Sequence, residues 1–270
     1  VPVCYTEAYA SFGVKCIVAP KVPNNEGSLS VIRVTAPEDT ILNAKKPAPV
    51  CARHVTGQML PDVVFGCLRQ ARPGKVPAEG TSCLWNIRLA GGQGGQNTQG
   101  SATKGRRFTV VGFNTGGTGA RPAQDGLSVT SFPSGVRNVS LEIMETISPL
   151  VFWRKELRAD SGGAGYRRGG LGGTYALRYE GEGDALINAA GEGLVVAPYG
   201  VDGGSEGAVH RYEIVRADGT RAVLGIRDTS VRLSPGDVLV CNSAGGGGYG
   251  DPLKRERELV KRDVERWKER

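Results

Sequence analysis

A chain of 270 residues with 39% hydrophobic content is long enough to bury a sizeable core, as one large domain or two modest ones. Its net charge of +7 comes from basic residues spread along the sequence, and its aromatic content is only 6%, so the pattern typical of nucleic-acid binding is absent. No apolar run reaches the roughly 18 residues that a membrane span needs, and no signal peptide opens the sequence.

The cysteines show no CxxC pair and no other short metal-ligand spacing; they are Cys4, Cys16, Cys51, Cys67, Cys83 and Cys241. Cys67 and Cys241 lie among apolar neighbours, which favours buried free thiols in a reducing cytosol over disulfides. We therefore expect a cytoplasmic protein with neither a nucleic-acid nor a membrane partner.

The first two predicted elements are a helix and a strand. Residues 3–19 form an amphipathic pattern that Pro20 ends. Residues Leu29–Ala36 are rich in β-branched side chains and alternate, which indicates a strand closed by Pro37. Because the sequence lacks an initiator methionine and its first helix starts without a capping residue, we expect that the chain was cut from a longer one.

A second helix is predicted over residues 52–71, bent or split at Gly57 and Pro61. His54 stands near its start and is a candidate functional residue because Arg53 lies beside it, although a lone histidine is more often structural. With only two histidines in the sequence, His54 and His210, a two-histidine metal site formed wholly within the chain is not expected.

The sequence then becomes rich in strands and glycine loops. Residues Ser82–Leu89 and Phe108–Phe113 are predicted strands, separated by the polar glycine loop Gly91–Gly105. This loop has no GxxxxGK[ST] pattern and no helix follows it, so it gives little support to a nucleotide site. A second loop, Gly116–Gly126, holds Arg121 and Asp125 between turn-forming residues. Either a fixed charge pair is offered to a ligand there, or the two residues form a surface salt bridge.

Two glutamates in the next segment are candidates for acid–base chemistry. Glu142 and Glu145 lie on one side of the chain if the segment is helical and on opposite sides if it is a strand, and the sequence leaves this open. Solvated charge is the simpler interpretation. A predicted strand, Leu150–Leu157, follows.

Seven of the fourteen residues from Asp160 to Gly173 are glycine. Such a run is retained in a fold where φ is positive or where backbones approach closely. Because the run also carries Tyr166, Arg167 and Arg168, an ordered connection is favoured over a flexible linker.

Short strands at regular spacing dominate the remainder: Thr174–Tyr179, Ala185–Ala190, Ala208–Arg216, Arg221–Ile226 and Val238–Cys241. Asp218 and Gly219 supply the turn of a hairpin between the third and fourth of these. The predicted fold is α+β, with short antiparallel strands in a sandwich or barrel-like sheet, N-terminal helices and a charged C-terminal helix. We divide the chain into a helix–strand–helix segment (1–75), a β-rich glycine-loop region (76–252) and that last helix (253–270).

Three glycine segments together resemble the hydantoinase B family, which includes subunits of oxoprolinases, caprolactamases and acetone or acetophenone carboxylases. These segments read GGTGARPAQDG, DSGGAGYRRGGLGG and AGGGGYGDP. The segments PNNEG, APEDTILNAKKPAPV and DPLKRERELVKRDV are also similar to that family's sequences, in the same order. The resemblance runs over essentially the whole chain, and the chain looks like the C-terminal half of the family's subunit.

The resemblance implies a component of an ATP-dependent hydrolase of cyclic amides such as hydantoin, oxoproline or a lactam. A hydantoinase A-type partner subunit would use ATP and magnesium to phosphorylate the substrate. The histidine and aspartate ligands of a divalent metal (zinc, manganese or iron) would belong to the N-terminal half of the same subunit. We expect no activity without that half and the partner. The alternatives are a subunit of a ketone carboxylase and a non-catalytic scaffold.

The candidate site residues are Arg53, His54, Arg121, Asp125 and Glu145. A B-type subunit must bind an anionic intermediate, for which Arg121 or Arg53 is a suitable electrostatic partner. His54 could orient the intermediate or carry a proton.

Overall fold

The computed structural model describes residues 1–270 except 52, 83–84, 93–106, 191–192, 226–227 and 269–270. The helices are α1 (Val3–Val18), α2 (Glu26–Leu29), α3 (Arg53–Ala71), α4 (Leu141–Ile147), the short 3-10 helix η1 (Pro252–Lys254) and α5 (Arg257–Lys268). The strands are β1 (Trp85–Gly91), β2 (Phe108–Asn114), β3 (Leu150–Leu157), β4 (Gly173–Tyr179), β5 (Ala185–Ala190), β6 (Arg211–Val215), β7 (Arg221–Leu224), β8 (Val231–Leu233) and β9 (Val238–Asn242).

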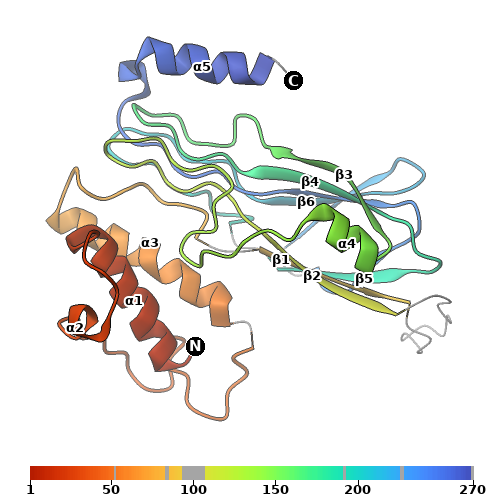
Figure 1. Ribbon diagram of the computed structural model, residues 1–270, viewed down its shortest axis with the longest axis horizontal. Helices are drawn as coiled ribbons and strands as arrows, with labels where there is room; N and C mark the ends of the chain where they lie inside the picture. Colours follow the sequence, from red (N-terminus) through yellow and green to blue (C-terminus); the bar gives the residue numbers. More distant parts are fainter. Residues whose placement is uncertain (52, 83–84, 93–106, 191–192, 226–227, 269–270) are drawn as a thin grey trace.

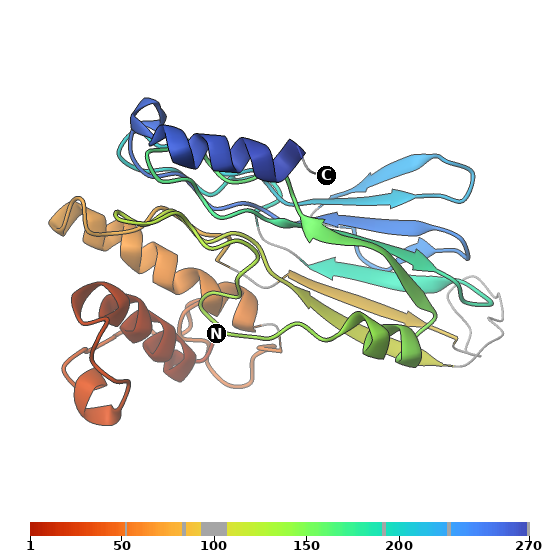
Figure 2. The same cartoon turned by 45° about the horizontal axis from the view of Figure 1, so that its top comes forward.

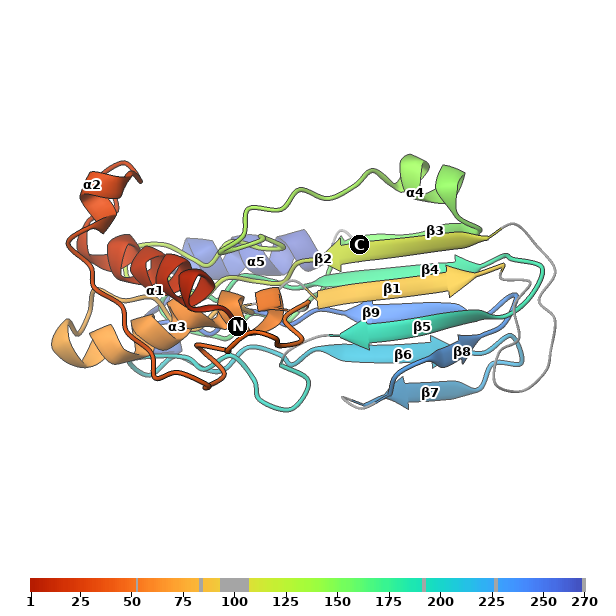
Figure 3. The ribbon, with the colours of Figure 1, turned by 90° about the horizontal axis from the view of Figure 1, so that it is seen from below.

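The strands form two antiparallel sheets, with the orders β2-β1-β5-β8 and β3-β4-β9-β6-β7. The sheets lie face to face and their strands run along the longest dimension of the molecule (Figures 1 and 3). Both sheets are open at their edges, so the predicted α+β fold with antiparallel strands is confirmed as a sandwich rather than a barrel. The short strand β8 was not predicted.

Alternation of side chains along the strands builds the core between the sheets. In β5, Ala185 and Ile187 are fully buried whereas Leu186 between them is 39% exposed. Ile187 packs in one cluster with Ile214 of β6 and Leu239 of β9, from the opposite sheet. The predicted hairpin is present as β6 and β7, and Gly219 in its turn has a φ of 86°.

The helices α1 and α3 pack closely against each other beside the sandwich (Figure 1). Gly13 of α1 lies against Pro61 of α3, where an added Cβ would be 2.9 Å from the proline Cα. Gly57 of α3 lies against the ring of Tyr5 in the same way. The helix α3 runs unbroken through both positions, so Gly57 and Pro61 do not split it. They permit the close crossing of the two helices.

The strand predicted over Leu29–Ala36 is wrong. Leu29 ends the helix α2, which begins with a capping box between Asn25 and Ser28. Residues 30–36, all of them described, contain no strand. Val31 in this stretch is 83% exposed. β-branched residues form a strand only where a neighbouring strand accepts their backbone hydrogen bonds, and this segment has none beside it.

Residues 116–130, 160–172, 198–208 and 243–250 form a bundle of extended glycine-rich segments, which we call the glycine bundle. Consecutive amides of one segment bond to different neighbours: Gly245 N donates to Ala208 O, Gly246 N to Gly170 O and Gly247 N to Glu79 O. Gly248 N then returns to the first neighbour, at Ser205 O. This three-residue repeat is that of a polyproline II helix, which makes no internal hydrogen bonds.

Close packing of backbones explains the glycines of this bundle. At Gly169 an added Cβ would lie 1.9 Å from the carbonyl oxygen of Gly246. None of the seven glycines between Asp160 and Gly173 has a positive φ. The predicted ordered connection is therefore confirmed, and of its two possible causes close approach is the one that applies.

The helix α5 lies on one side of the glycine bundle and the α1–α3 pair lies on the other (Figures 1 and 2). Arg255, just before α5, donates to both carboxylate oxygens of Asp125 at 2.8 and 2.9 Å, and to Asp263 of α5 at 2.7 Å. The side chain of Arg255 is only 8% exposed. This ion-pair network joins α5 to the bundle. The division of the chain into three segments stays a prediction.

Candidate functional site

A cavity of about 400 Å³ lies between the helices α1 and α3 and the loops that follow them. We call it the helix-side cavity. Its lining comes from three parts of the chain: Cys16 and Ile17 of α1; Asp62 and Phe65 of α3; and Lys75, Pro77, Ala78, Gly80, Thr118, Gly119, Arg121, Pro122, Leu127, Thr130 and Phe132 of the loops. Its walls are mostly apolar, so it suits a small molecule with an apolar body.

Charged groups in the helix-side cavity are Asp62, Lys75 and Arg121. The turn at residues 121–124 is closed by backbone hydrogen bonds, and Arg121 Nη2 donates to the backbone oxygen of Asp125 at 2.9 Å. This contact fixes the guanidinium, while its buried Nε has no hydrogen-bond partner among the described residues. Two cations and one carboxylate thus face a largely apolar space, which favours a ligand with a negative charge.

Asp62 is buried in the wall of this cavity. Its pKa is raised to about 6: burial is the main cause, the neighbouring Glu79 adds to the rise, and hydrogen bonds from Ser82 and the Gly80 backbone oppose it. Ser82 Oγ donates to Asp62 Oδ2. A carboxyl group with this pKa changes protonation state near neutral pH, which is unusual for an aspartate.

Replacing Asp62 with asparagine is expected to stabilise the fold above pH 6. The pKa of Asp62 is higher in the folded chain than in the unfolded chain, so ionisation opposes folding as pH rises from about 4 through 6. A shift of about two pKa units corresponds to up to about 3 kcal/mol above pH 6, and to almost nothing below pH 4. Urea unfolding of both forms at pH 4 and pH 8 measures this difference. An equal effect at both pH values would contradict the buried charge.

Arg53 and His54 lie at the start of α3, away from this cavity. Arg53 stacks over the ring of Tyr5 with 5.7 Å to its centroid, and Arg53 Nη1 donates to Val50 O. Asp62 lies nine positions after Arg53 in the helix, a rise of about 14 Å along its axis. Neither Arg53 nor His54 lines the helix-side cavity. Their functional roles stay predictions.

Asp125 pairs with Arg255 and not with the side chain of Arg121. It also accepts from the backbone N–H of Arg168 at 2.9 Å, and these contacts lower its pKa despite burial. The charge pair expected in the loop Gly116–Gly126 therefore does not form, because a cation 130 residues further along the chain holds the carboxylate. Of the five candidate site residues, only Arg121 lines the helix-side cavity.

Glu145 lies on the helix α4, so Glu142 and Glu145 belong to one helix. Glu145 Oε1 accepts from the backbone N–H of Phe152 at 2.8 Å, which fastens α4 to the strand β3. The second histidine, His210, is buried, and its Nδ1 accepts from the backbone N–H of Ala244 at 3.0 Å. Burial and the nearby Arg158 lower the pKa of His210 to about 3, so it is neutral and structural at neutral pH.

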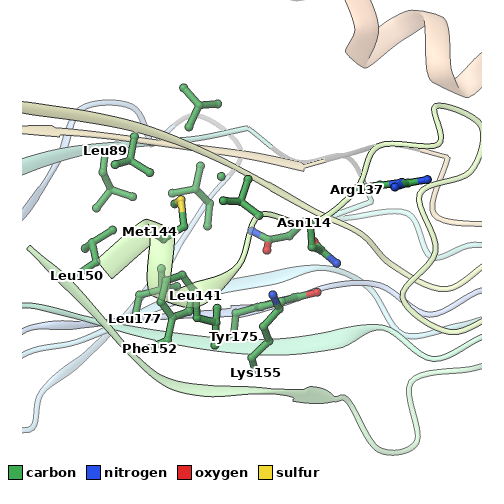
Figure 4. Close-up of a pocket in the computed structure, with 16 residues that line it drawn as sticks. Leu89, Asn114, Arg137, Leu141, Met144, Leu150, Phe152, Lys155, Tyr175 and Leu177 are labelled. Carbon is green, nitrogen blue, oxygen red and sulfur yellow. The ribbon is translucent and has the colours of Figure 1, made fainter. Parts of the chain in front are cut away.

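A gap of about 50 Å³ between the two sheets is the main alternative site (Figure 4). Leu89, Met144, Leu150 and Leu177 gather on one side of it, and Arg137 lies toward the other end. A volume of this size holds one or two water molecules. It is much smaller than the usual ligand pocket, so we place no substrate there.

The described residues contain no group of three or more His, Cys, Asp or Glu side chains that could hold a metal ion. In that part of the chain, no helix is long and apolar enough to cross a membrane. The five cysteines described carry free thiols, and Cys241 is buried as predicted, whereas Cys67 is exposed. Cys83, like most of the loop Gly91–Gly105, lies outside the described residues.

Residues 1–252 match the family model described as hydantoinase B/oxoprolinase. The chain belongs to this family. It is 35% identical over 261 residues to an uncharacterized protein of Methanocaldococcus jannaschii, covering 96% of this chain and 43% of that protein. The beta subunit of caprolactamase from Pseudomonas jessenii is 30% identical, with 90% of this chain and 42% of the subunit covered. The family predicted from the glycine segments is thereby confirmed.

Two solved structures share the fold of this family member. The ATP-dependent caprolactamase from Pseudomonas jessenii superimposes with a TM-score of 0.79 at 26% identity, covering 96% of this chain and 45% of that one. The nucleotide-free structure of acetone carboxylase, from work on ATP-dependent acetone carboxylation, gives a TM-score of 0.70 at 21% identity, covering 95% and 38%. The chain thus spans less than half the length of the relatives it matches.

Proposed function

We propose that the chain is a component of an ATP-dependent cyclic-amide hydrolase that acts with an A-type, ATP-using subunit. The observation that carries the proposal is the similarity to ATP-dependent caprolactamase over 96% of the chain. The helix-side cavity supports it, because an apolar space with a fixed arginine suits a small ring that acquires negative charge.

Within this proposal Arg121 stabilises the negative charge of the phosphorylated intermediate. An amide carbonyl is a poor electrophile, and phosphorylation of its oxygen creates a good leaving group and an anion. The guanidinium of Arg121 is held by the Asp125 carbonyl and is therefore oriented before the anion arrives. Orientation before binding lowers the cost of ordering the site.

We propose that the divalent metal binds to the remainder of the assembly, as the resemblance to the family implies. We propose that the partners are an A-type subunit and the polypeptide that corresponds to the rest of the longer relatives. ATP and magnesium would bind to the A-type subunit. A cytoplasmic location stays a prediction.

The test is ATP turnover by the complex assembled with both partners. We expect ATP hydrolysis to depend on a cyclic amide, when hydantoin, 5-oxoproline and caprolactam are each supplied. Turnover that requires bicarbonate and a ketone would instead assign the complex to the carboxylases. The scaffold alternative would be favoured if variants of the helix-side cavity left the turnover unchanged.

Replacing Arg121 with glutamine is expected to lower kcat/KM of the assembled enzyme by about tenfold or more, because a charge-assisted hydrogen bond is lost. Arg137→Gln is the matched control, since Arg137 is exposed and borders only the gap between the sheets. Steady-state kinetics on both variants, with their unfolding temperatures, separate a loss of binding from a loss of folding. Equal activity of the two variants would contradict the role of Arg121.

A further inference from the structure

The helix-side cavity has a neighbour on the other side of the segment 79–82. This second cavity has a volume of about 300 Å³. It is lined by Met59, Glu79, Gly80, Thr81, Ser82, Gly193, Leu194, Val195, Val196 and Pro198. Gly80 borders both cavities, so only a thin wall of chain separates them.

A hydrogen bond crosses this wall. Asp62 lines the helix-side cavity, and Ser82, which lines the second cavity, donates its hydroxyl to Asp62 Oδ2. Glu79 also lines the second cavity, and its charge acts on Asp62. Ser82 and Asp62 therefore form a hydrogen-bonded connection between two spaces whose other walls are largely apolar, and the charge of Glu79 reaches Asp62 from the second cavity.

The backbone at Ser82 is held in an unusual conformation. Its φ is 54°, in the left-handed region that residues other than glycine seldom adopt. The neighbouring Thr81 N donates to Gly117 O at 3.0 Å, which anchors the segment to the glycine bundle. Such conformations persist where the surrounding structure enforces them, and they concentrate at functional sites.

We propose that Asp62 is the acid–base group of the helix-side cavity, and that Ser82 and Glu79 connect its proton to the second cavity. This inference rests on the proposed function, in which a ring is opened inside the helix-side cavity. Ring opening forms a bond between a water oxygen and the carbonyl carbon and breaks the C–N bond. Asp62 gives a proton to the departing nitrogen and recovers one from the attacking water. Ser82 acts as a positioning residue, because it orients Asp62.

Polar and charged groups lie near Asp62 in both cavities. Lys75 and Arg121 share the helix-side cavity with it, while Ser82 and Glu79 lie on the side of the second cavity. Burial raises the pKa of Glu79 as well, although its carboxylate accepts from the Tyr199 backbone N–H. The pKa shifts of Glu79 and Asp62 thus have the same direction, and the charge of Glu79 acts on Asp62.

The first test is a titration of the Asp62 carboxyl group, followed by its infrared absorption and assigned by its loss in Asp62→Asn. In the wild-type chain we expect a midpoint near pH 6. Ser82→Ala is expected to raise the midpoint, because the hydroxyl favours the ionised form, and Glu79→Gln is expected to lower it, because a negative neighbour is removed. Glu142→Gln, an exposed acid on α4, is the control and should shift nothing. Unchanged midpoints in both test variants would overturn the proposal that Ser82 and Glu79 connect the proton of Asp62 to the second cavity.

The second test is the pH profile of the assembled enzyme acting on the cyclic amide that gives most turnover. Asp62→Asn is expected to lower kcat/KM at least about 100-fold and to remove the pH dependence near pH 6. Asp62→Glu should recover part of the activity. Ser82→Ala should move the midpoint of the profile upward, and Ser82→Thr should restore it, which a purely structural role would not produce.

The outcomes separate this inference from the proposed function. An active enzyme in which Asp62→Asn keeps its pH profile and activity within threefold would overturn the role of Asp62 and leave the proposed function standing. A wild-type complex that hydrolyses no cyclic amide would overturn the proposed function and the catalytic role of Asp62 with it. In that case the opposite shifts in the infrared titration would still establish that Ser82 and Glu79 act on the Asp62 carboxyl group across the wall between the cavities.

Discussion

Gly169→Ala is expected to prevent the chain from reaching its native structure. The added Cβ would lie 1.9 Å from the carbonyl oxygen of Gly246, well inside van der Waals contact, and the neighbouring atoms are backbone. Neither segment can move without breaking its other hydrogen bonds, such as Gly170 N to Thr118 O. We therefore expect a loss of more than about 4 kcal/mol, at the extreme of single substitutions.

Gly112→Ala is the matched control for this change. Gly112 lies in the strand β2, and an added Cβ there would meet nothing closer than 4.0 Å. Alanine restricts the unfolded chain more than glycine does, so the control should be neutral or stabilising by about 0.5–1 kcal/mol. Soluble yield and urea unfolding compare the two variants. A folded Gly169→Ala chain with a native unfolding midpoint would contradict the close packing of the glycine bundle.

Arg255→Met is expected to destabilise the chain by about 3–5 kcal/mol and to release the helix α5. Removing the guanidinium takes from the Asp125 carboxylate, which is only 19% exposed, the cation that hydrogen-bonds to both of its oxygens, and leaves only the more distant charge of Arg168. Asp263 keeps a weaker partner in Arg168, whose Nε lies 3.4 Å away. Burying one uncompensated charge costs more than losing an exposed pair.

The release of α5 can be followed by amide hydrogen exchange across the helix. In Arg255→Met we expect amide exchange at residues 257–265 to be faster than in the wild type, while amide exchange in the two sheets stays the same. Lys261→Met is the control, because Lys261 pairs with Glu265 on the exposed side of the same helix. That variant should remain within about 0.5 kcal/mol of the wild type. Equal protection of α5 in Arg255→Met and the wild type would contradict the role of the ion-pair network in holding α5 on the glycine bundle.

The ion-pair network also makes the stability of the fold depend on pH, and the sign of this dependence follows from the pKa of Asp125. Asp125 has a lower pKa in the folded chain than its ordinary value, so its contribution to stability is present above about pH 4. It is lost as pH falls further, when the carboxylate takes up a proton. In Arg255→Met the free energy of unfolding should therefore fall less between pH 4 and lower pH than it does in the wild type.

Local patterns in the sequence predicted most of the fold. The helices α1 and α3 follow from apolar periodicity, and the hairpin of β6 and β7 follows from Asp218 and Gly219 in its turn. The alternation in β5 likewise reports its buried and exposed faces. Each of these features depends on residues close together in the chain, and the sequence displays them directly.

Features that depend on distant residues were predicted less well. The strand expected at Leu29–Ala36 has the right residue types but no partner strand, and β8 has only three residues. Asp125 was paired with Arg121, four residues away, because no local signal points to Arg255. The cause of the glycine run, close packing rather than positive φ, likewise depends on which segments meet.

Asp62 is the functional candidate that sequence reasoning missed. It follows Pro61 within a run of apolar residues, on a helix whose buried face includes Leu60 and Phe65. A carboxylate at a position where the helical pattern predicts burial is the signal that could have revealed it. Its partner Ser82 lies 20 residues away and carries no comparable signal.

The glycine bundle has a consequence for the order in which the chain folds. Its segments come from four separate regions between residues 116 and 250, and many of its amide hydrogen bonds join different segments, such as Gly246 N to Gly170 O. The segment 243–250 cannot form a stable structure alone, because a polyproline II helix has no internal hydrogen bonds. The bundle should therefore consolidate late and in one cooperative step, after hairpins such as β6–β7 have brought its segments together, and this high contact order predicts slow refolding.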